Sequence, residues 1–224
     1  MIDIKVILII VLVFSVSPAL KAQVTKKSFQ STYYEQKLTL FENLPNTKKE
    51  IIFLGNSIID GCEWAEIFHN KKIKNRGITG DGTEGVLFRL NEVTESQPAK
   101  IFLLIGINDL ARGISKDTVF CNICKIAMQI QVNSLKTKVY IQSLLPVNPN
   151  FGKFPSHCSK TEDILWINQK LKDWCVHTSA QFIDLFSKFK NENNNNMNPR
   201  YTNDGLHLEG EGYLLWAMTI QEYL

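Results

Sequence analysis

The sequence lacks a strong excess of either charge. Its 25 lysine and arginine residues against 22 aspartate and glutamate residues leave a formal net charge of +3 over 224 residues. So small and scattered a surplus does not favour nucleic acid or an anionic membrane surface as a partner. With 44% hydrophobic and 21% charged residues, the composition is that of an ordinary globular protein. We therefore expect one folded domain with a small or uncharged polar partner, and no nucleic-acid partner.

Long hydrophobic runs are also absent. The longest apolar run, from Val6 to Val16, is well short of the ~20 residues that a membrane-spanning helix needs. It follows a short segment containing Lys5 and precedes small residues up to Ala22, which is the order of regions in a secretory signal peptide. We predict that residues 1–22 are an export signal cleaved near Ala22. The mature chain is then periplasmic or extracellular, with no stable membrane insertion.

Cysteine is scarce and odd in number, with five residues at positions 62, 121, 124, 158 and 175. Complete pairing within one chain is therefore excluded. The Cys121-x-x-Cys124 spacing occurs in metal and redox sites, but no second pair follows and no histidine stands near it in the sequence. We interpret these cysteines as small buried hydrophobic residues. A disulfide stays open as an alternative, because the protein is expected to be exported.

Short runs rich in β-branched and aromatic residues alternate with longer amphipathic segments. We predict strands at 50–55, 71–78, 100–106, 138–145 and 180–186. We predict helices at about 60–69, 83–96, 118–135, 161–177 and 209–223. Five repeats of strand and then helix indicate an α/β protein, with a parallel sheet in a three-layer α/β/α sandwich.

Three further segments complete the predicted organisation. The folded domain is expected over residues 49–224. Residues 23–48 form a lead-in segment, for which a helix packed on the rim of the domain is one alternative. The asparagine-rich stretch at 191–198 has no periodicity and predicts an exposed connecting loop.

Residues whose side chains can take part in catalysis follow the predicted strands and precede the last helix. They stand in the blocks GNSIID, RGITGDGT, GINDLARG and NDGLHL. Parallel sheets place ligands outside the carboxyl ends of their strands, where these blocks would meet. Ser57 in the first block is the candidate nucleophile, although a serine in that place also suits a helix cap. His207 is the candidate base, and Asp204 would orient its imidazole and stabilise the imidazolium.

The middle blocks supply candidate donors for an oxyanion. The backbone N–H groups of Ser57 and Gly80 and the side-chain amide of Asn108 would face the oxygen on which negative charge develops. The alternative interpretation is that Gly80 only turns the chain and that Asn108 and Asp109 only cap the next helix. The joint occurrence of the four blocks in this order favours a catalytic site.

These blocks resemble the four conserved blocks of the SGNH, or GDSL-type, esterases and lipases. The similarity runs from about residue 50 to the C-terminus, and NRGITGDGTEGVLFRL and LHLEGEGY look especially like the catalytic α subunits of platelet-activating-factor acetylhydrolase. The resemblance implies a flavodoxin-like sheet in the order 2-1-3-4-5 and a triad of Ser57, Asp204 and His207. It implies oxyanion donors at Gly80 and Asn108, and neither a metal nor an organic cofactor. Asn56 stands where the GDS form has aspartate.

The resemblance favours an exported serine esterase that acts through an acyl-serine intermediate. The chain shows none of the long insertions that cover a large lipid pocket in true lipases, which favours acetyl or another short acyl group. We prefer an acetylated glycan as substrate, such as a sialic acid or a polysaccharide, to an acetylated lipid or lysophospholipid. Two alternatives remain, namely acyl transfer to an alcohol and a non-catalytic carbohydrate-binding module. No oligomeric state is assigned.

The other prominent side chains are weaker candidates for chemistry. His69 and His177 lie near predicted helix ends, where a cation suits the helix dipole. His157 lies in a proline-bounded loop after the fourth strand, where it could line the substrate side. Trp64 and Phe88 are assigned to the core in preference to an acyl pocket.

Overall fold

A five-stranded parallel sheet forms the centre of the protein in the computed structural model, which describes residues 31–224. The strand order is β2-β1-β3-β4-β5, and every neighbouring pair is parallel. The strands are β1 Ile51–Gly55, β2 Ile73–Gly77, β3 Lys100–Leu104, β4 Lys138–Gln142 and β5 Gln181–Ile183. The predicted α/β class and the flavodoxin-like strand order are both confirmed.

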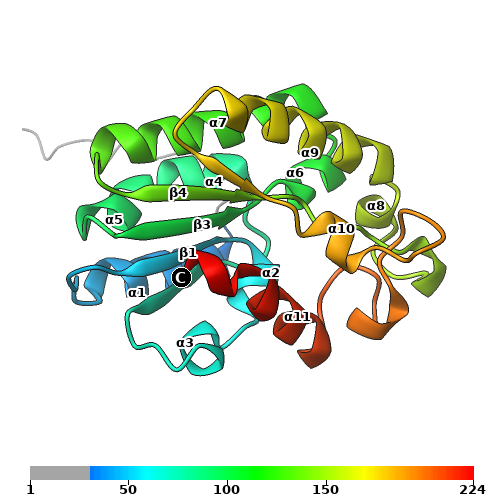
Figure 1. Ribbon diagram of the computed structural model, residues 1–224, viewed down its shortest axis with the longest axis horizontal. Coiled ribbons are helices and arrows are strands. Elements are labelled where there is room, and N and C mark those ends of the chain that lie inside the picture. The colour runs from blue at the N-terminus through cyan, green and yellow to red at the C-terminus, as the bar shows by residue number, and fades with distance from the viewer. Residues whose placement is uncertain (1–30) are drawn as a thin grey trace, which may run out of the picture.

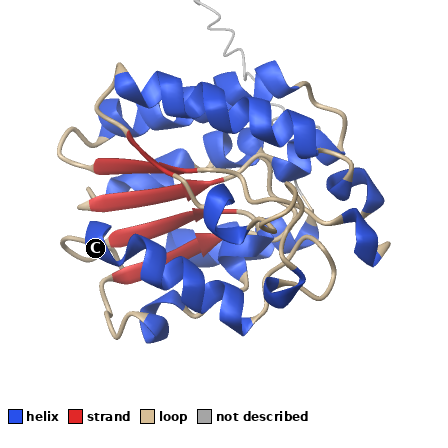
Figure 2. Ribbon diagram, turned by 45° about the vertical axis from the view of Figure 1, so that its right-hand side comes forward, coloured by secondary structure: helices blue, strands red, loops and turns tan. Residues whose placement is uncertain are grey.

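Helices cover both faces of this sheet and give three layers. The helices are α1 Thr32–Asn43, α2 Ser57–Asp60, α3 Trp64–Ile67, α4 Thr83–Phe88, α5 Leu90–Glu95, α6 Ile107–Ala111, α7 Lys116–Asn133, α8 Pro155–Cys158, α9 Thr161–Val176, α10 Phe186–Phe189 and α11 Gly210–Ile220. Short 3-10 helices are η1 Pro149–Phe151, η2 Pro199–Tyr201 and η3 Gln221–Tyr223. In Figure 1, α7 and α9 lie above the sheet, and α3 and α11 lie below it. Figure 2 shows the strands running side by side between these helix layers.

Aromatic rings cover one face of the sheet. Phe53, Phe102 and Tyr140 are register partners on neighbouring strands, with ring centroids 5.0 and 4.7 Å apart. Trp64 stacks on Phe53 at 4.3 Å, and Trp216 of α11 meets Trp64 edge-on at 4.9 Å. Burying a phenylalanine side chain contributes about 1.5–3 kcal/mol. This aromatic stack therefore joins the central strands firmly to α3 and α11.

The aromatic layer also holds α2 in place. The indole Nε1 of Trp64 donates a hydrogen bond of 2.9 Å to the carbonyl oxygen of Ile59. The hydroxyl of Tyr213 donates to the carbonyl oxygen of Ile58 at 3.1 Å. Both acceptors follow Ser57 directly in the chain, so the rings beneath α2 fix the helix that begins with this serine.

The opposite face of the sheet is aliphatic, since side chains alternate across a strand. Its buried strand residues are Ile52, Leu54, Ile101, Leu103, Val139 and Ile141. The buried residues of α7 include Val119, Ile123, Ile126 and Ile130. Their spacing of four, three and four residues makes the apolar stripe of an amphipathic helix, which covers this face.

The lead-in segment contains α1, which packs beside the β2 side of the sheet. Ser31 caps it by accepting a hydrogen bond from the backbone N–H of Tyr34. The hydroxyl of Tyr34 donates to the carbonyl oxygen of Gly85 at 2.8 Å, and Lys37 pairs with Asp60 at 2.7 Å. A packed helix is therefore the correct alternative for residues 32–43. The predicted signal peptide, residues 1–22, lies outside the described residues.

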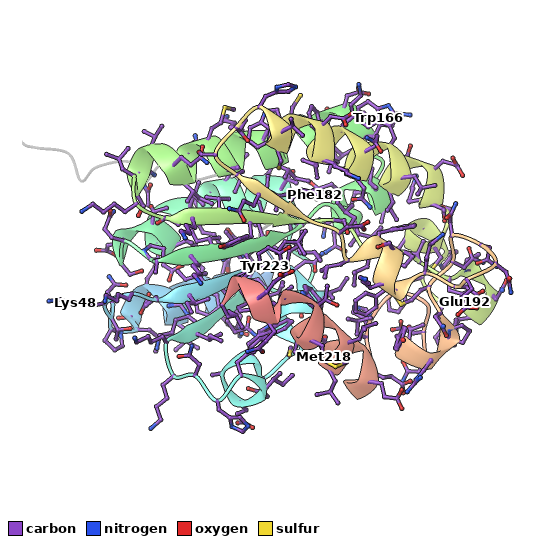
Figure 3. All side chains as sticks on the ribbon, in the orientation of Figure 1. Lys48, Trp166, Phe182, Glu192, Met218 and Tyr223 are labelled. Carbon is purple, nitrogen blue, oxygen red and sulfur yellow. The ribbon has the colours of Figure 1, made fainter. Side chains whose placement is uncertain are left out.

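The other predicted elements form with some corrections. Each strand lies within three residues of its predicted ends. Only the short helix α3 lies within the predicted helix at 60–69, since α2 ends at residue 60, and the predicted helix at 83–96 is divided into α4 and α5. Residues 191–198 are an irregular connection, with Glu192 on its outer side in Figure 3, but Met197 is fully buried, so the loop is not exposed throughout. Within residues 31–224, no helix has the length and apolarity that crossing a membrane requires.

Candidate active site

Ser57 lies at the carboxyl edge of the sheet, as the first residue of α2 and two residues after β1. The strand ends in Gly55, where an added Cβ would lie only 2.1 Å from the carbonyl oxygen of Leu104. Asn56 is the helix cap, because its Oδ1 accepts from the N–H of Ile58 at 3.0 Å. The alternative that Ser57 serves as the cap is therefore wrong. Its hydroxyl is left for another partner.

That partner is His207. The Oγ of Ser57 lies 3.1 Å from Nε2 of His207, and Nδ1 of His207 lies 2.7 Å from Oδ2 of Asp204. An ionised carboxylate can only accept, so Nδ1 carries the proton that it donates to Asp204. In the neutral imidazole, Nε2 is then an acceptor for the hydroxyl proton of Ser57. The three residues named from the sequence thus form one continuous chain of hydrogen bonds.

The turn that contains Asp204 also holds its carboxylate. Oδ1 of Asp204 accepts backbone N–H bonds from Leu206 and His207, each 2.8 Å long. Gly205 between them has φ +85°, a left-handed conformation that glycine adopts without strain. Partial burial opposes ionisation, but the donors of His207 and Leu206 outweigh it and lower the pKa of Asp204. The carboxylate is therefore ionised at neutral pH and its orientation is fixed.

Gly80 lies three residues after β2 with φ +80°, between two anchored groups. On its N-terminal side, Asp60 accepts from the N–H of Thr79 at 3.1 Å and from the Thr79 hydroxyl at 2.8 Å. On its C-terminal side, the guanidinium of Arg112 donates to the carbonyl oxygen of Gly80 at 2.5 Å. Gly80 thus lies in a turn that is held from both ends, which leaves its proposed role as an oxyanion donor open.

Asn108 lies in the first turn of α6, and its side-chain amide bridges two segments. Its Nδ2 donates to the carbonyl oxygen of Asp81 at 2.8 Å, and its Oδ1 lies 3.0 Å from Nε2 of His157. Asp109 accepts from the backbone N–H and the hydroxyl of Thr83, the first residue of α4. The pair therefore does not cap its own helix, because Asp109 caps α4.

A buried ion pair lies beneath these loops. Arg89 and Asp81 are 3.0 Å apart, and neither side chain has any exposed surface. The guanidinium of Arg89 also donates to the carbonyl oxygens of Gly55 and Arg76. Because a buried charge is costly without a partner, this pair fixes the segment that joins Gly80 to α4. Phe88, which we predicted to be in the core, is 48% exposed because its neighbour Arg89 takes the buried position.

The loop after β4 brings two residues to the site, of which only His157 is a candidate from the sequence. Phe154 has φ +51°, and its ring meets the ring of His207 edge-on at 5.2 Å. The same ring meets His157 edge-on at 5.8 Å. His157 was placed on the substrate side from its position in the loop, but its contact with Asn108 had no signal in the sequence. Proline favours an extended backbone in the residue before it, so Pro155 gives no indication of the positive φ of Phe154.

A small apolar cavity lies between the segments that carry Ser57 and His207. Its volume is about 10 Å³, and it is lined by Ile58, Leu104, Ile107, Leu144, Leu145, Pro146, Val147 and Leu206. About one water-sized group needs that much space. The cavity is therefore about the size of one water molecule and far smaller than a long acyl chain.

A family model described as the GDSL-like lipase/acylhydrolase family matches residues 53–215, which include the candidate triad and both loops with the candidate oxyanion donors. The chain belongs to this family. Membership places it among the carboxylic ester hydrolases, as the four sequence blocks predict.

Relatives of this acylhydrolase include platelet-activating factor acetylhydrolase IB subunit alpha1 of Homo sapiens, 31% identical over 103 residues, which are 43% of this chain and 44% of the relative. They also include N-acylneuraminate cytidylyltransferase of Escherichia coli, 24% identical over 87% of this chain and 47% of the relative. The chain thus spans about half the length of the curated relatives it matches. The crystal structure of a GDSL-like lipase from Bacteroides thetaiotaomicron is similar with a TM-score of 0.73 and 26% identity, covering 85% of this chain and 96% of that one.

The remaining candidates lie away from the Ser57, Asp204 and His207 cluster. His69 and His177 are exposed at the ends of α3 and α9, while Trp64 is a core residue as predicted. All five cysteines are free thiols in the described structure, and Cys121 is exposed, so the prediction of burial is wrong for it. Within residues 31–224, no three His, Cys, Asp or Glu side chains gather into a group that could hold a metal ion.

Proposed function

We propose that this protein is an exported serine esterase that hydrolyses O-acetyl or other short-chain acyl esters. The observation that carries the proposal is the continuous hydrogen-bonded chain from Ser57 through His207 to Asp204. The family match supports the reaction class, because it covers all three residues.

In the proposed mechanism, Ser57 Oγ attacks the ester carbonyl carbon while His207 Nε2 takes the hydroxyl proton. The carbonyl oxygen becomes an oxyanion, which accepts hydrogen bonds from the N–H groups of Ser57 and Gly80 and from Nδ2 of Asn108. When the tetrahedral intermediate collapses, the bond to the leaving alcohol breaks and His207 returns its proton to that oxygen. Asp204 stabilises the imidazolium in both steps.

The second half of the reaction removes the acyl group from Ser57. A water molecule gives a proton to His207 Nε2 and attacks the acyl carbon, and the serine oxygen leaves with that proton. The products are the free acid and the original enzyme. An alcohol in place of water would give acyl transfer, so incubation with an added sugar acceptor and product analysis distinguishes the two outcomes.

A short acyl group is favoured by the cavity next to the nucleophile. Ile58 and Leu206, the chain neighbours of Ser57 and His207, both line it, and its volume of about 10 Å³ suits a methyl group. An acyl chain of eight carbons has no room there without movement of the loop after β4. We therefore infer that acetyl esters are the preferred substrates.

We propose an acetylated glycan as the source of this ester, such as an O-acetylated sialic acid or polysaccharide. The Escherichia coli relative, which matches 87% of this chain, is named for N-acylneuraminate. The human relative is named for platelet-activating factor, so an acetylated lipid is the second candidate. The signal-like pattern of residues 1–22 supports action outside the cytoplasm. The N-terminal sequence of the exported protein would test cleavage near Ala22.

The first experiment compares hydrolysis of p-nitrophenyl acetate, butyrate and octanoate by the wild type, Ser57→Ala and the exposed control Ser187→Ala. We expect the acetate to turn over fastest, a loss of at least ~10³-fold for Ser57→Ala, and no loss for Ser187→Ala. Acetate release from O-acetylated sialic acid, acetylated xylan and an acetylated ether lipid then ranks the natural substrate classes. Equal, slow turnover by wild type and Ser57→Ala would favour the non-catalytic binding module.

A further inference from the structure

A second histidine contacts the candidate oxyanion donor. Nε2 of His157 lies 3.0 Å from Oδ1 of Asn108, across 49 residues of sequence. This contact is separate from the triad, in which His207 meets Ser57 and Asp204. His157 therefore has its own geometric connection to the site.

The carbonyl of Asp81 decides the orientation of the Asn108 amide. A backbone carbonyl can only accept, so the amide atom at 2.8 Å from it must be Nδ2. The other amide atom, which faces His157, is then the acceptor Oδ1. Because Oδ1 cannot donate, Nε2 of His157 must carry a hydrogen and donate it. Both the tautomer of His157 and the orientation of Asn108 follow from a single backbone carbonyl.

The surroundings of His157 keep it neutral. Its Nδ1 is buried and has no hydrogen-bond partner among the described residues, so a proton there would have no acceptor. Burial, and then the positive charges that His207 and Arg112 can carry, lower the pKa of His157. The neutral form with hydrogen on Nε2 is thus the form that fits this position at neutral pH.

The loop that carries His157 is fixed to the triad segment. The backbone N–H of Asn148 donates to the carbonyl oxygen of Gly205 at 2.8 Å, and the buried thiol of Cys158 lies 3.5 Å from the same oxygen. The ring of Phe154 lies edge-on to both His157 and His207. One loop therefore contacts Gly205 and His207 on one side and Asn108 on the other.

We propose that His157 is a positioning residue for the oxyanion hole and acts through Asn108. Its Nε2–H bond holds Oδ1 and prevents a flip of the amide. With one Nδ2 hydrogen bound to Asp81, the second hydrogen of Nδ2 is the one directed to the developing oxyanion. Donation to Oδ1 also polarises the amide and strengthens Nδ2 as a donor. The inference rests on the proposed esterase function of the same site.

The kinetic test is a cycle of variants assayed with p-nitrophenyl acetate. His157→Leu removes the donor, whereas His157→Gln keeps an N–H at a similar distance from the backbone. Since loss of a whole oxyanion donor costs about 10²–10³-fold, we expect His157→Leu to lower kcat by roughly 10-fold with KM nearly unchanged. His157→Gln should recover most of that loss. In an Asn108→Ala background, His157→Leu should cause no further decrease.

Two results would overturn the proposal. One is an equal loss in His157→Leu and His157→Gln at matched thermal stability, and the other is a full additional loss in the Asn108→Ala background. A histidine that acts independently, for example by contacting substrate, gives the second result.

An activity-independent measurement separates this inference from the esterase assignment. Nitrogen-15 NMR of the histidine rings in Ser57→Ala protein should show His157 as the neutral tautomer with hydrogen on Nε2. The Nε2–H signal should shift when Asn108 becomes alanine. If Ser57→Ala keeps full esterase activity, the proposed function fails while these spectra still decide the role of His157. Detection of the tautomer with hydrogen on Nδ1 would refute the positioning role of His157.

Discussion

The triad and the candidate oxyanion donors lie at the same sheet edge but are held in different ways. Asp204 is oriented by N–H groups two and three residues away, and its own turn contains His207. Asn108 is oriented by Asp81 across 27 residues and by His157 across 49. The segment from Asp204 to His207 is thus organised locally, whereas the orientation of the Asn108 amide depends on residues distant in the sequence.

The two regions also differ in burial, because the Asp204 and His207 side chains are more exposed than the ion pair beneath the loops of Gly80 and Asn108. The side chains of His207 and Asp204 are 33% and 14% exposed, so this pair is partly open to solvent. The side chains of the ion pair between Asp81 and Arg89, beneath the loops that carry Gly80 and Asn108, have no exposed surface. Changes in the triad should therefore reduce catalysis with little effect on folding. Changes to the ion pair beneath the loops of Gly80 and Asn108 should also reduce the free energy of unfolding.

The largest effect is expected for Asp204→Asn. The amide nitrogen of asparagine would face Nδ1 of His207 and favour the wrong imidazole tautomer, so kcat should fall about 10⁴-fold. The thermal midpoint should change little, because the turn keeps its backbone. Steady-state kinetics beside the exposed control Asp184→Asn test this prediction. A large loss of stability would contradict the local organisation of the triad.

Arg89→Met tests how much the buried ion pair with Asp81 contributes to the stability of the fold. Removing one partner of a buried ion pair leaves a buried carboxyl uncompensated, and typically costs about 3–5 kcal/mol in the free energy of unfolding. The matched control is Arg200→Met, because Arg200 pairs with Glu211 on the surface, where solvent screens the interaction and the pair adds little to stability. Urea denaturation of both variants gives the comparison. Equal costs for the two arginines would refute a structural role for the buried pair.

Arg112→Met should have a smaller effect, confined to catalysis. Arg112 holds the carbonyl oxygen of Gly80, next to the proposed N–H donor, and loosening that peptide should lower kcat by about 10-fold. KM should stay within about two-fold, and Arg112→Lys should restore part of the loss by keeping one donor. A rise in KM at constant kcat would instead indicate that Arg112 binds the substrate.

The smallest effect is expected for Asp60→Asn, and it should depend on pH. Burial opposes the charge of Asp60, but hydrogen bonds from Lys37, Thr79 and Tyr33 outweigh it and lower its pKa. A lowered pKa stabilises the fold above the unfolded-state pKa, and this contribution is lost as the pH falls below about 4. We expect a cost of about 1 kcal/mol at pH 7, allowing for solvent screening. The difference from wild type should shrink in acid, which denaturation at pH 7 and pH 3 would measure.

The difference between local and long-range contacts also explains which parts of the fold and of the candidate site could be predicted from the sequence. The strands follow from continuous apolar runs, and Ser57, Asp204 and His207 stand in short blocks that build their own surroundings. The partners of the oxyanion segment had no such signal, because Arg112 and His157 reach it across 32 and 49 residues.

The polarity of the residues gave a wrong prediction of burial at Phe88 and Arg89. Phe88 was assigned to the core, yet it is 48% exposed, and its neighbour Arg89 is 2% exposed. A charged residue takes the inner position there only because Asp81, eight residues earlier, compensates it. Hydrophobic pattern alone contains no information about such compensation.

The aromatic stack below α2 gives the protein an intrinsic optical probe. Trp64 and Trp216 are fully buried, with ring centroids 4.9 Å apart and planes at 77°. Indoles so close and so inclined couple their electronic transitions and produce a distinctive circular dichroism signal. Because Trp64 also donates to Ile59 in the helix that begins with Ser57, this signal depends on the packing under the serine. A change in the packing beneath Ser57 can therefore be followed spectroscopically without a label.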